Sequence, residues 1–251
     1  MHIGIVTLFP EIAASFGSLG VTGRAVEDGR ITLDIENPRS HAGDAHGTVD
    51  DRPYGGGPGM VLKVEPMRDA IEALRKRLPD ASRTVLMSPQ GRPFDQDRAR
   101  QFAELDGLLL VCGRYEGVDE RLLELAIDEE VSVGDFVVSG GELPALLVAD
   151  AVARLVPGVL GAEKSAEQDS FVEGLLDCPH YTRPEEVSGL KVPPVLLSGD
   201  HEKVRRWRLK QALGRTWRRR PELLRSRRLR DEEQSLLDEF IAEAKSLNGR
   251  K

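Results

Sequence analysis

The first 160 residues alternate short apolar runs with amphipathic segments, and this alternation limits the chain to few folds. Runs such as HIGIVTL at 2–8 and ITLDIE at 31–36 predict strands, whereas VEPMRDAIEALRKRL at 64–78 predicts a helix with one apolar face. Strands that alternate with helices usually form a parallel sheet covered by helices. We therefore predict an α/β fold with a mostly parallel sheet for this part of the chain.

Further helices follow the same pattern. They are predicted at 95–105, 119–127 and 141–155. In the third of these helices an apolar stripe is expected to pack on the core, and it consists of Leu143, Leu146, Leu147 and Ala151.

Three glycine-bearing segments follow or contain predicted buried strands. They are SPQG at 88–91 after TVLM, GRYEG at 113–117 after LLLVC, and SVGDFVVSGGELP at 132–144, which overlaps VSV. A single such loop is adequately explained as a turn, but glycine also lets the backbone come close to a ligand. Three in series at strand ends predict a pocket walled largely by backbone. The segments lack the GxxxxGK[ST] and GxGxxG signatures, which disfavours nucleotide triphosphate hydrolysis and Rossmann-type dinucleotide binding.

Composition places the chain among ordinary globular proteins, with 40% apolar and 31% charged residues. No run approaches the roughly 20 apolar residues of a membrane span. The N-terminus does not resemble a signal peptide, and Cys112 and Cys178 are too few for a disulfide framework. We expect no membrane association and a cytoplasmic location.

The net charge of −7 conceals a basic region. Residues 201–230 contain thirteen Lys or Arg and two Glu, a balance of +11, which leaves −18 for the remainder. A solvated helix face is one interpretation, and clustered charge of this size favours RNA or DNA as the other. Trp207 and Trp217 within this region are either helix anchors or stacking platforms for bases.

The character of the chain changes after Pro157-Gly158. We predict a domain at 1–160, a polar flexible linker at 161–170, and a smaller, mainly helical domain at 171–251 with helices near 200–214 and 231–247. The glycine-rich segment 37–60 is too long for a routine connection, so it is either a flexible surface loop or a functional one.

Several polar residues have both an ordinary and a functional interpretation. Arg154 lies four residues after Asp150, so it either forms a helix-surface pair or holds an oxyanion in a site. Asp169 precedes Ser170 and Glu173, a capping-box pattern that predicts a helix start. The five histidines form no i, i+4 metal pair, and Cys178-Pro-His180 lacks further ligands nearby in the sequence.

Taken together, the motifs are similar to those of the bacterial tRNA (guanine-N1)-methyltransferases, in collinear order through nearly the whole chain. The similarity is carried by DRPYGGGPGM at 51–60, by the three glycine segments, by LLDCPHYTRP at 175–184 and by RRWRLKQALGRTW at 205–217. This resemblance implies a SPOUT fold, an α/β sheet with a deep trefoil knot, and a homodimer whose active sites are shared between protomers. It also implies S-adenosylmethionine as the methyl donor and the guanine at position 37 of tRNA, next to the anticodon, as the substrate.

The resemblance assigns roles residue by residue. Asp169 is similar to the family's general base and Arg154 to the residue that supports negative charge on the guanine. The residues expected at the donor are Leu86, Ser88, Pro89, Gly91, Gly113, Arg114, Tyr115, Glu116, Gly117, Val133, Gly134, Phe136, Val138, Gly140, Gly141 and Pro144. Phe136 and Val138 stand where the family often has Tyr and Leu. Contacts to the donor through the backbone are expected to persist, whereas a contact through the tyrosine hydroxyl would be lost. The family's activity is associated with Mg²⁺, for which no cage of oxygen ligands is legible in the sequence; Glu116 is a candidate to contact the donor, the guanine or the ion.

The C-terminal domain is expected to hold the tRNA anticodon stem-loop, with Arg218, Arg219 and Arg220 among the phosphate contacts. Two alternatives remain open at this stage. One is a SPOUT methyltransferase that acts on ribosomal RNA, and the other is an RNA-binding protein that holds S-adenosylmethionine without turnover.

Overall fold

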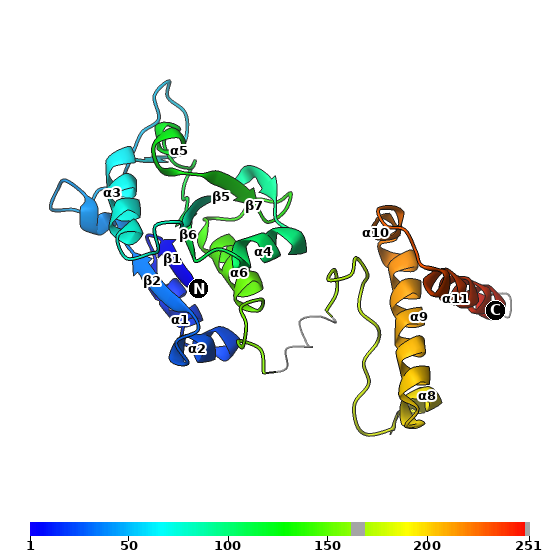
Figure 1. The fold of residues 1–251 in the computed structure, drawn as a ribbon. Coiled ribbons are helices and arrows are strands. Elements are labelled where there is room, and N and C mark those ends of the chain that lie inside the picture. The colour runs from blue at the N-terminus through cyan, green and yellow to red at the C-terminus, as the bar shows by residue number, and fades with distance from the viewer. Residues whose placement is uncertain (162–168, 249–251) are drawn as a thin grey trace. The chain divides into compact units, whose positions relative to one another are not determined.

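The computed structural model describes residues 1–161 and 169–248. Its chain divides into two compact units, Met1–Glu163 and Lys164–Lys251 (Figure 1). None of the helices in the described part of the chain combines the length and the apolar character that a membrane span requires.

The first unit is built on a five-stranded sheet in the order β2-β1-β6-β5-β7, and every pairing in it is parallel (Figure 1). This confirms the predicted α/β class. The strands are β1 (His2–Val6), β2 (Thr32–Glu36), β5 (Arg83–Pro93), β6 (Gly107–Cys112) and β7 (Glu129–Ser132).

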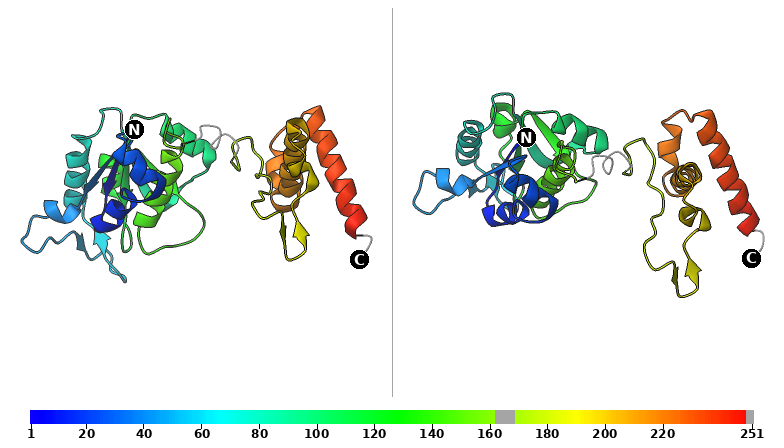
Figure 2. Two further views of the ribbon diagram at one scale, coloured as in Figure 1. Left: turned by 90° about the horizontal axis from the view of Figure 1, so that it is seen from below. Right: turned by 60° about the horizontal axis from the view of Figure 1, so that its bottom comes forward.

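Helices cover both faces of this sheet, as the views in Figure 2 also show. Residues on alternate positions of the buried strands point to opposite faces, so Leu108 and Leu110 join one core while Leu109 and Val111 join the other. The first core includes side chains of α1 (Pro10–Phe16), α2 (Gly20–Glu27), α4 (Gln96–Ala103) and α6 (Glu142–Ala153). The second core includes side chains of α3 (Val64–Arg75) and α5 (Arg121–Ala126).

The buried face of α6 differs from the prediction. Leu143 and Leu147 are 66% and 51% exposed, whereas the small side chains of Ala145 and Ala149 are fully buried against the sheet. Almost every position of this helix is apolar, so its sequence has no polar side that marks the buried face. Small residues allow α6 to approach the sheet closely. Of the predicted stripe, Leu146 packs partly against the core, whereas Leu143 and Leu147 remain outside.

Strand β5 contains the first glycine segment instead of ending before it. Met87 and Arg92 both pair with Val131 of β7, so residues 88–91 form an excursion between two paired stretches of the same strand. The sequence predicted only the first of these stretches, because the second, RP at 92–93, is neither apolar nor rich in strand-forming residues.

The second unit is mainly helical, and its core lies between two long helices, α9 (His201–Arg219) and α11 (Asp231–Asn248). Leu213 of α9 packs there with Leu236 and Leu237 of α11. Both helices were predicted. The sequence did not predict the remaining elements of this unit. These are a hairpin of β8 (Glu186–Val187) and β9 (Leu190–Lys191) and the short helices α8 (Pro194–Leu197) and α10 (Pro221–Arg225).

Candidate functional site

A cavity of about 400 Å³ lies where β6 and β7 end and where β5 is interrupted. Its volume falls in the range of about 300–1,000 Å³ that is usual for small-molecule sites. The three glycine segments meet here because the carboxyl ends of neighbouring parallel strands share one edge of the sheet. Fifteen of the sixteen residues expected at the methyl donor line the cavity, namely Leu86, Ser88, Pro89, Gly113, Arg114, Tyr115, Glu116, Gly117, Val133, Gly134, Phe136, Val138, Gly140, Gly141 and Pro144. Their contacts with a donor stay a prediction.

Gly91 is the one expected residue that does not line this cavity. A Cβ added to Gly91 would lie 2.3 Å from the backbone nitrogen of Val131, so the glycine allows β5 to pass close against β7. Gly141 combines both roles: it lines the cavity, and an added Cβ there would lie 2.7 Å from the Cα of Cys112. Close backbone contacts therefore explain part of the glycine pattern without reference to a ligand.

A buried ion pair holds two of the segments together. The Oε2 atom of Glu142, a residue only 4% exposed, lies 3.0 Å from the Nε atom of Arg114. The other carboxylate oxygen of Glu142 accepts a hydrogen bond of 2.9 Å from the hydroxyl of Thr7. The Arg114 guanidinium also donates to the carbonyl of Ser139 and lies 4.3 Å above the ring of Phe9. These contacts fix the 113–117 segment against the start of α6.

The sequence does not reveal that Glu142 takes part. An acidic residue in the first turn of a helix is already explained by the helix dipole, and Thr7 precedes Glu142 by 135 residues. Only the fold brings these side chains to Arg114.

The glycine-rich segment 37–60 is anchored next to the cavity at its C-terminal end. The backbone N–H of Glu116 donates to the carbonyl of Met60, and the N–H of Leu62 donates to the carbonyl of Gly117, both at 3.0 Å. A short ladder between β3 (Asp50–Asp51) and β4 (Val61–Leu62) closes the base of the loop. The side chain of Tyr54 at its tip is fully exposed. The loop is therefore tied to the wall of the cavity.

The outer wall of the cavity is apolar and poorly covered. Phe136, Val137 and Val138 are 58%, 88% and 40% exposed. Exposed apolar side chains around a cavity are typical of a site that a ligand or partner covers.

Arg154 immediately follows α6 in the first unit, and its backbone N–H donates to the carbonyl of Asp150 at 3.1 Å. It lies on the same side of the helix as Leu143 and Leu147, since these positions are separated by four, seven and eleven residues. This side is the one that α6 turns away from the sheet. Arg154 is not among the residues that line the 400 Å³ cavity.

Asp169 belongs to the second unit, where it lies on the wall of another cavity of about 530 Å³ together with residues of α9. The helix start predicted at Ser170 and Glu173 is not formed, because Phe171 has φ of +73° and the chain turns at 169–174. The hydroxyl of Ser170 instead accepts a hydrogen bond from the N–H of Asp177. The N-terminal part of the predicted linker, 162–168, lies outside the described residues.

The same cavity contains Asp177, Cys178 and His180, whose potential ligand atoms lie within 4.8 Å of one another. Burial of Asp177 by itself would raise its pKa, but its hydrogen bonds with His180 and with the Cys178 N–H outweigh that effect and lower the pKa. Burial raises the pKa of the Cys178 thiol, which keeps its proton. Sulfur and nitrogen donors suit Mg²⁺ poorly, so this group does not provide the ion site that the resemblance implies.

The two tryptophans differ in their surroundings. The ring of Trp207 lies 6.3 Å from the ring of Tyr181, a contact that joins α9 to the segment before the hairpin. Trp217 is 38% exposed. Trp207 thus serves as a helix anchor in this structure, whereas a stacking role for Trp217 stays a prediction.

Comparisons with known proteins agree with this picture. Residues 1–226 match the family model described as tRNA (Guanine-1)-methyltransferase TrmD. A tRNA (guanine-N(1)-)-methyltransferase of Methylococcus capsulatus is 61% identical over 243 residues, which are 97% of this chain and 97% of that protein. Proteins of the same name from Chromohalobacter salexigens and Shewanella denitrificans are 59% and 58% identical, over 97% and 96% of this chain and 93% and 97% of theirs.

Proposed function

The chain belongs to the tRNA (guanine-1)-methyltransferase family, and we propose that it transfers a methyl group from S-adenosylmethionine to N1 of guanine 37 in tRNA. Membership confirms the tRNA methyltransferase activity and the knotted SPOUT class expected from the motifs. It decides against a ribosomal RNA enzyme and against a protein without turnover. The observation that carries the proposal is the convergence of the three glycine segments on one cavity.

The 400 Å³ cavity is the proposed donor site. Backbone groups of the 113–117 and 133–141 segments line it, and the glycines leave room for a ligand to approach them. Its apolar outer wall around Phe136 suits the cover of a bound adenosyl group. S-adenosylmethionine supplies, when bound, a methyl group that its sulfonium already activates, so the task of the protein is to position the guanine and remove its proton.

Asp169 is the proposed general base. Guanine N1 carries a proton at neutral pH, and it becomes an adequate nucleophile when a carboxylate accepts that proton. Loss of the proton moves negative charge onto O6 of guanine, where the guanidinium of Arg154 would stabilise it. We further propose that Mg²⁺ binds at this cavity. Its wall includes Glu116, Glu120 and Glu130, which carry the oxygen ligands that this ion prefers.

A homodimer is the second part of the proposal, and the exposed side of α6 supports it. Helix α6 lies beside α1 and α2 in the first unit. Five large apolar side chains on these three helices or at their ends are 36–69% exposed: Ile12, Leu19, Val21, Leu143 and Leu147. Contiguous exposed apolar surface usually marks an interface. A second copy that covered this surface would also lie next to Arg154, which fits an active site shared between protomers.

The assay that tests the function uses purified protein, labelled S-adenosylmethionine and two tRNA transcripts. One transcript carries guanine at 36 and 37, and the other carries adenine at 37. We expect label in the first transcript alone. Equal labelling of both transcripts would rule out position 37 as the site, and binding of both ligands without labelling would contradict the activity itself.

A further inference from the structure

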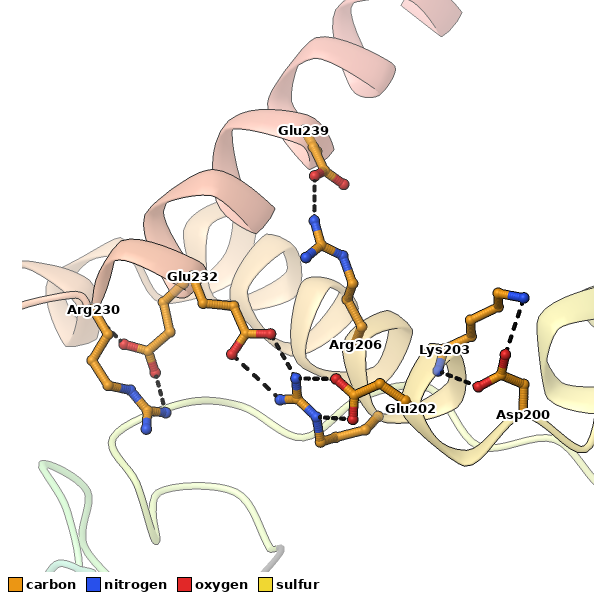
Figure 3. A network of polar contacts seen from close by, with 9 residues as sticks. Asp200, Glu202, Lys203, Arg206, Arg230, Glu232 and Glu239 are labelled. Carbon is orange, nitrogen blue, oxygen red and sulfur yellow. Dashed lines mark hydrogen bonds and ion pairs between the residues drawn. The ribbon is translucent and has the colours of Figure 1, made fainter.

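The basic region at 201–230 is much less basic in the folded protein than its composition indicates. Seven of its thirteen cationic side chains form ion pairs: Lys203, Arg205, Arg206, Lys210, Arg220, Arg227 and Arg230. Figure 3 shows part of this network, in which Arg206 reaches Glu239 and Lys203 reaches Asp200. The positive charge available to a partner is therefore restricted to particular positions.

The pairing is concentrated on the side of α9 that faces α11. Arg206 lies 2.7 Å from Glu239, and Lys210 lies 2.6 Å from Glu243, both measured between guanidinium or ammonium nitrogen and carboxylate oxygen. Leu213 continues this side into the apolar core between the two helices. The acidic helix α11 thus neutralises one side of α9.

The opposite side of α9 carries a second set of cationic residues. Arg208, Arg215 and Arg219 are separated by seven and four residues, so they form one row along the helix, here called the basic row. Arg208 and Arg215 are about 10 Å apart along the axis, from a rise of 1.5 Å per residue. None of the three has an ion pair with an acidic side chain among the residues that the structure describes. His201, seven residues before Arg208, extends the row towards the start of the helix.

The basic row begins at the cavity that contains Asp169: Arg208 lines this cavity, whereas Arg215 and Arg219 lie further along α9 and do not. His201, Val204, Arg208 and Ala212 line that cavity from α9, and Asp169 and Asp177 line it from the preceding segment. The cavity thus contains both the guanidinium of Arg208 and the carboxylates of Asp169 and Asp177. A ligand that fits both kinds of group has anionic groups for the arginines and hydrogen-bond donors for the carboxylates.

We propose that the basic row binds consecutive backbone phosphates of the tRNA anticodon loop while the cavity accepts a base with N–H donors. Guanine presents such donors at N1 and N2, and the phosphates of the RNA backbone around it would lie outside the cavity, on the row. An acidic peptide would also present anionic groups to the row, so it is the alternative that the test includes. This inference rests on the proposed function and specifies where the second unit contacts the substrate.

The proposal also changes an expectation from the sequence. Arg218, Arg219 and Arg220 were expected to act together as phosphate contacts. In the structure Arg220 pairs with Glu222, and the Arg218 guanidinium lies 5.1 Å from the ring centroid of Phe240. Of these three arginines, only Arg219 belongs to the basic row.

The test compares two triple variants of the full chain that lose equal charge from one helix. The first replaces the basic row (Arg208→Gln, Arg215→Gln, Arg219→Gln), and the matched control replaces paired cations (Lys203→Gln, Arg206→Gln, Lys210→Gln). The affinity for an unmodified tRNA transcript is measured from 50 to 300 mM salt, with circular dichroism and thermal melting to establish that each variant is folded.

We expect the basic-row variant to bind tRNA at least tenfold more weakly and to lose about two units from the slope of log K against log salt, since each phosphate contact in a single strand contributes about 0.7. The control is expected to lose less than one unit. Equal slopes in the two variants would overturn the proposal, because net charge alone would then govern binding.

Two further readouts separate this inference from the proposed function. Methylation of the guanine-37 transcript by the wild type tests the function alone. If the transcript is not methylated but the salt slopes of the two variants differ as expected, the proposed function fails while the basic row is still supported as the tRNA contact. Polyglutamate serves as the acidic-peptide probe. Binding of polyglutamate that requires the row, with tRNA affinity unchanged in the row variant, would overturn the assignment to RNA.

Discussion

Asp169 is a partly buried carboxylate on the wall of a cavity, at the turn that Ser170 and Asp177 close by a hydrogen bond. Its position on the cavity wall distinguishes it from the helix-capping carboxylate that the local sequence indicates. Its proposed role depends on its charge and not on its size.

Replacement of Asp169 by Asn tests that role. We expect the turnover number for the guanine-37 transcript to fall by at least 10²-fold, since general base catalysis typically contributes 10²–10⁴-fold. The affinity for S-adenosylmethionine, measured by calorimetry, should stay within about threefold of the wild type. Asp97→Asn, an exchange on the outer surface of α4, is the control. Unchanged turnover in Asp169→Asn would remove this residue from the mechanism.

Glu142 is a second residue whose effect can be measured, because it is a buried carboxylate that pairs with Arg114. Glu142→Gln leaves the guanidinium without its counter-charge and should lower the free energy of unfolding by about 2–4 kcal/mol. Thr7→Val removes the hydroxyl that donates to Glu142 and accepts from the N–H of Phe9, but it keeps the ion pair of Glu142 with Arg114, and it should cost about 1–2 kcal/mol. Thermal melting with and without S-adenosylmethionine is the measurement, and stabilisation by the ligand should also decline in Glu142→Gln. Similar effects of the two variants would mean that the charge of Glu142 is unimportant.

At the scale of elements, a buried carboxylate at the start of α11 holds the segment before this helix in place. Glu233 has no exposed side-chain surface and pairs with Arg227 at 2.6 Å and with Arg230 at 3.1 Å. Arg227 also donates to the carbonyl of Glu173, in the turn that carries Asp169. One side chain of α11 is thus linked through Arg227 to the turn that carries Asp169.

The stability of this unit should depend on pH through Glu233. Burial by itself would raise the pKa of this carboxyl, but hydrogen bonds from the Arg230 backbone and from the two guanidinium groups outweigh burial and lower the pKa. A lowered pKa in the folded state stabilises the protein above the unfolded value of about 4.3, and this stabilisation is lost as the pH falls further.

The experiment uses tryptophan fluorescence, because both tryptophans of the chain, Trp207 and Trp217, belong to the second unit. We expect Glu233→Gln to lower the free energy of unfolding by about 2–3 kcal/mol at pH 7. Between pH 5 and pH 3, the free energy of unfolding of this variant should decline less than that of the wild type. Glu239→Gln breaks an exposed pair with Arg206 and should cost less than about 1 kcal/mol. Parallel pH profiles of the wild type and Glu233→Gln would contradict the assignment.

At the scale of the whole molecule, the question is what covers the exposed leucines of α6. If a second copy does so, Leu143→Glu combined with Leu147→Glu should convert a dimer into a monomer, because four charges would enter an apolar interface. Sedimentation velocity measures the change, and methylation should fall with it. Leu125→Glu, at a 60% exposed position of α5, should leave the oligomeric state unchanged. A wild type that sediments as a monomer at micromolar concentration would contradict the dimer.

The elements of the first unit were predictable to different degrees. Strands β1, β2, β6 and β7 and helices α3 to α5 have apolar periods that identify them locally, and the structure confirms them within a few residues. Helices α1 and α2 were not predicted, because their burial is limited to a few small residues such as Ala13 and Ala25. In the second unit, the two-residue strands β8 and β9 are too short to show any period.

The sequence by itself determined the α/β class, the spacing of the glycine segments and the family, because periodicity and motif order are local properties of the chain. Only the tertiary structure decided that Leu143 and Leu147 lie outside, that Glu142 meets Arg114, and that α11 neutralises one side of α9. Each of these depends on which distant residues come into contact, and a count of apolar or charged residues in one segment is the same for either outcome. The basic region shows this most directly: its charge was evident from the composition, but the part of it that faces a partner depends on where α11 packs.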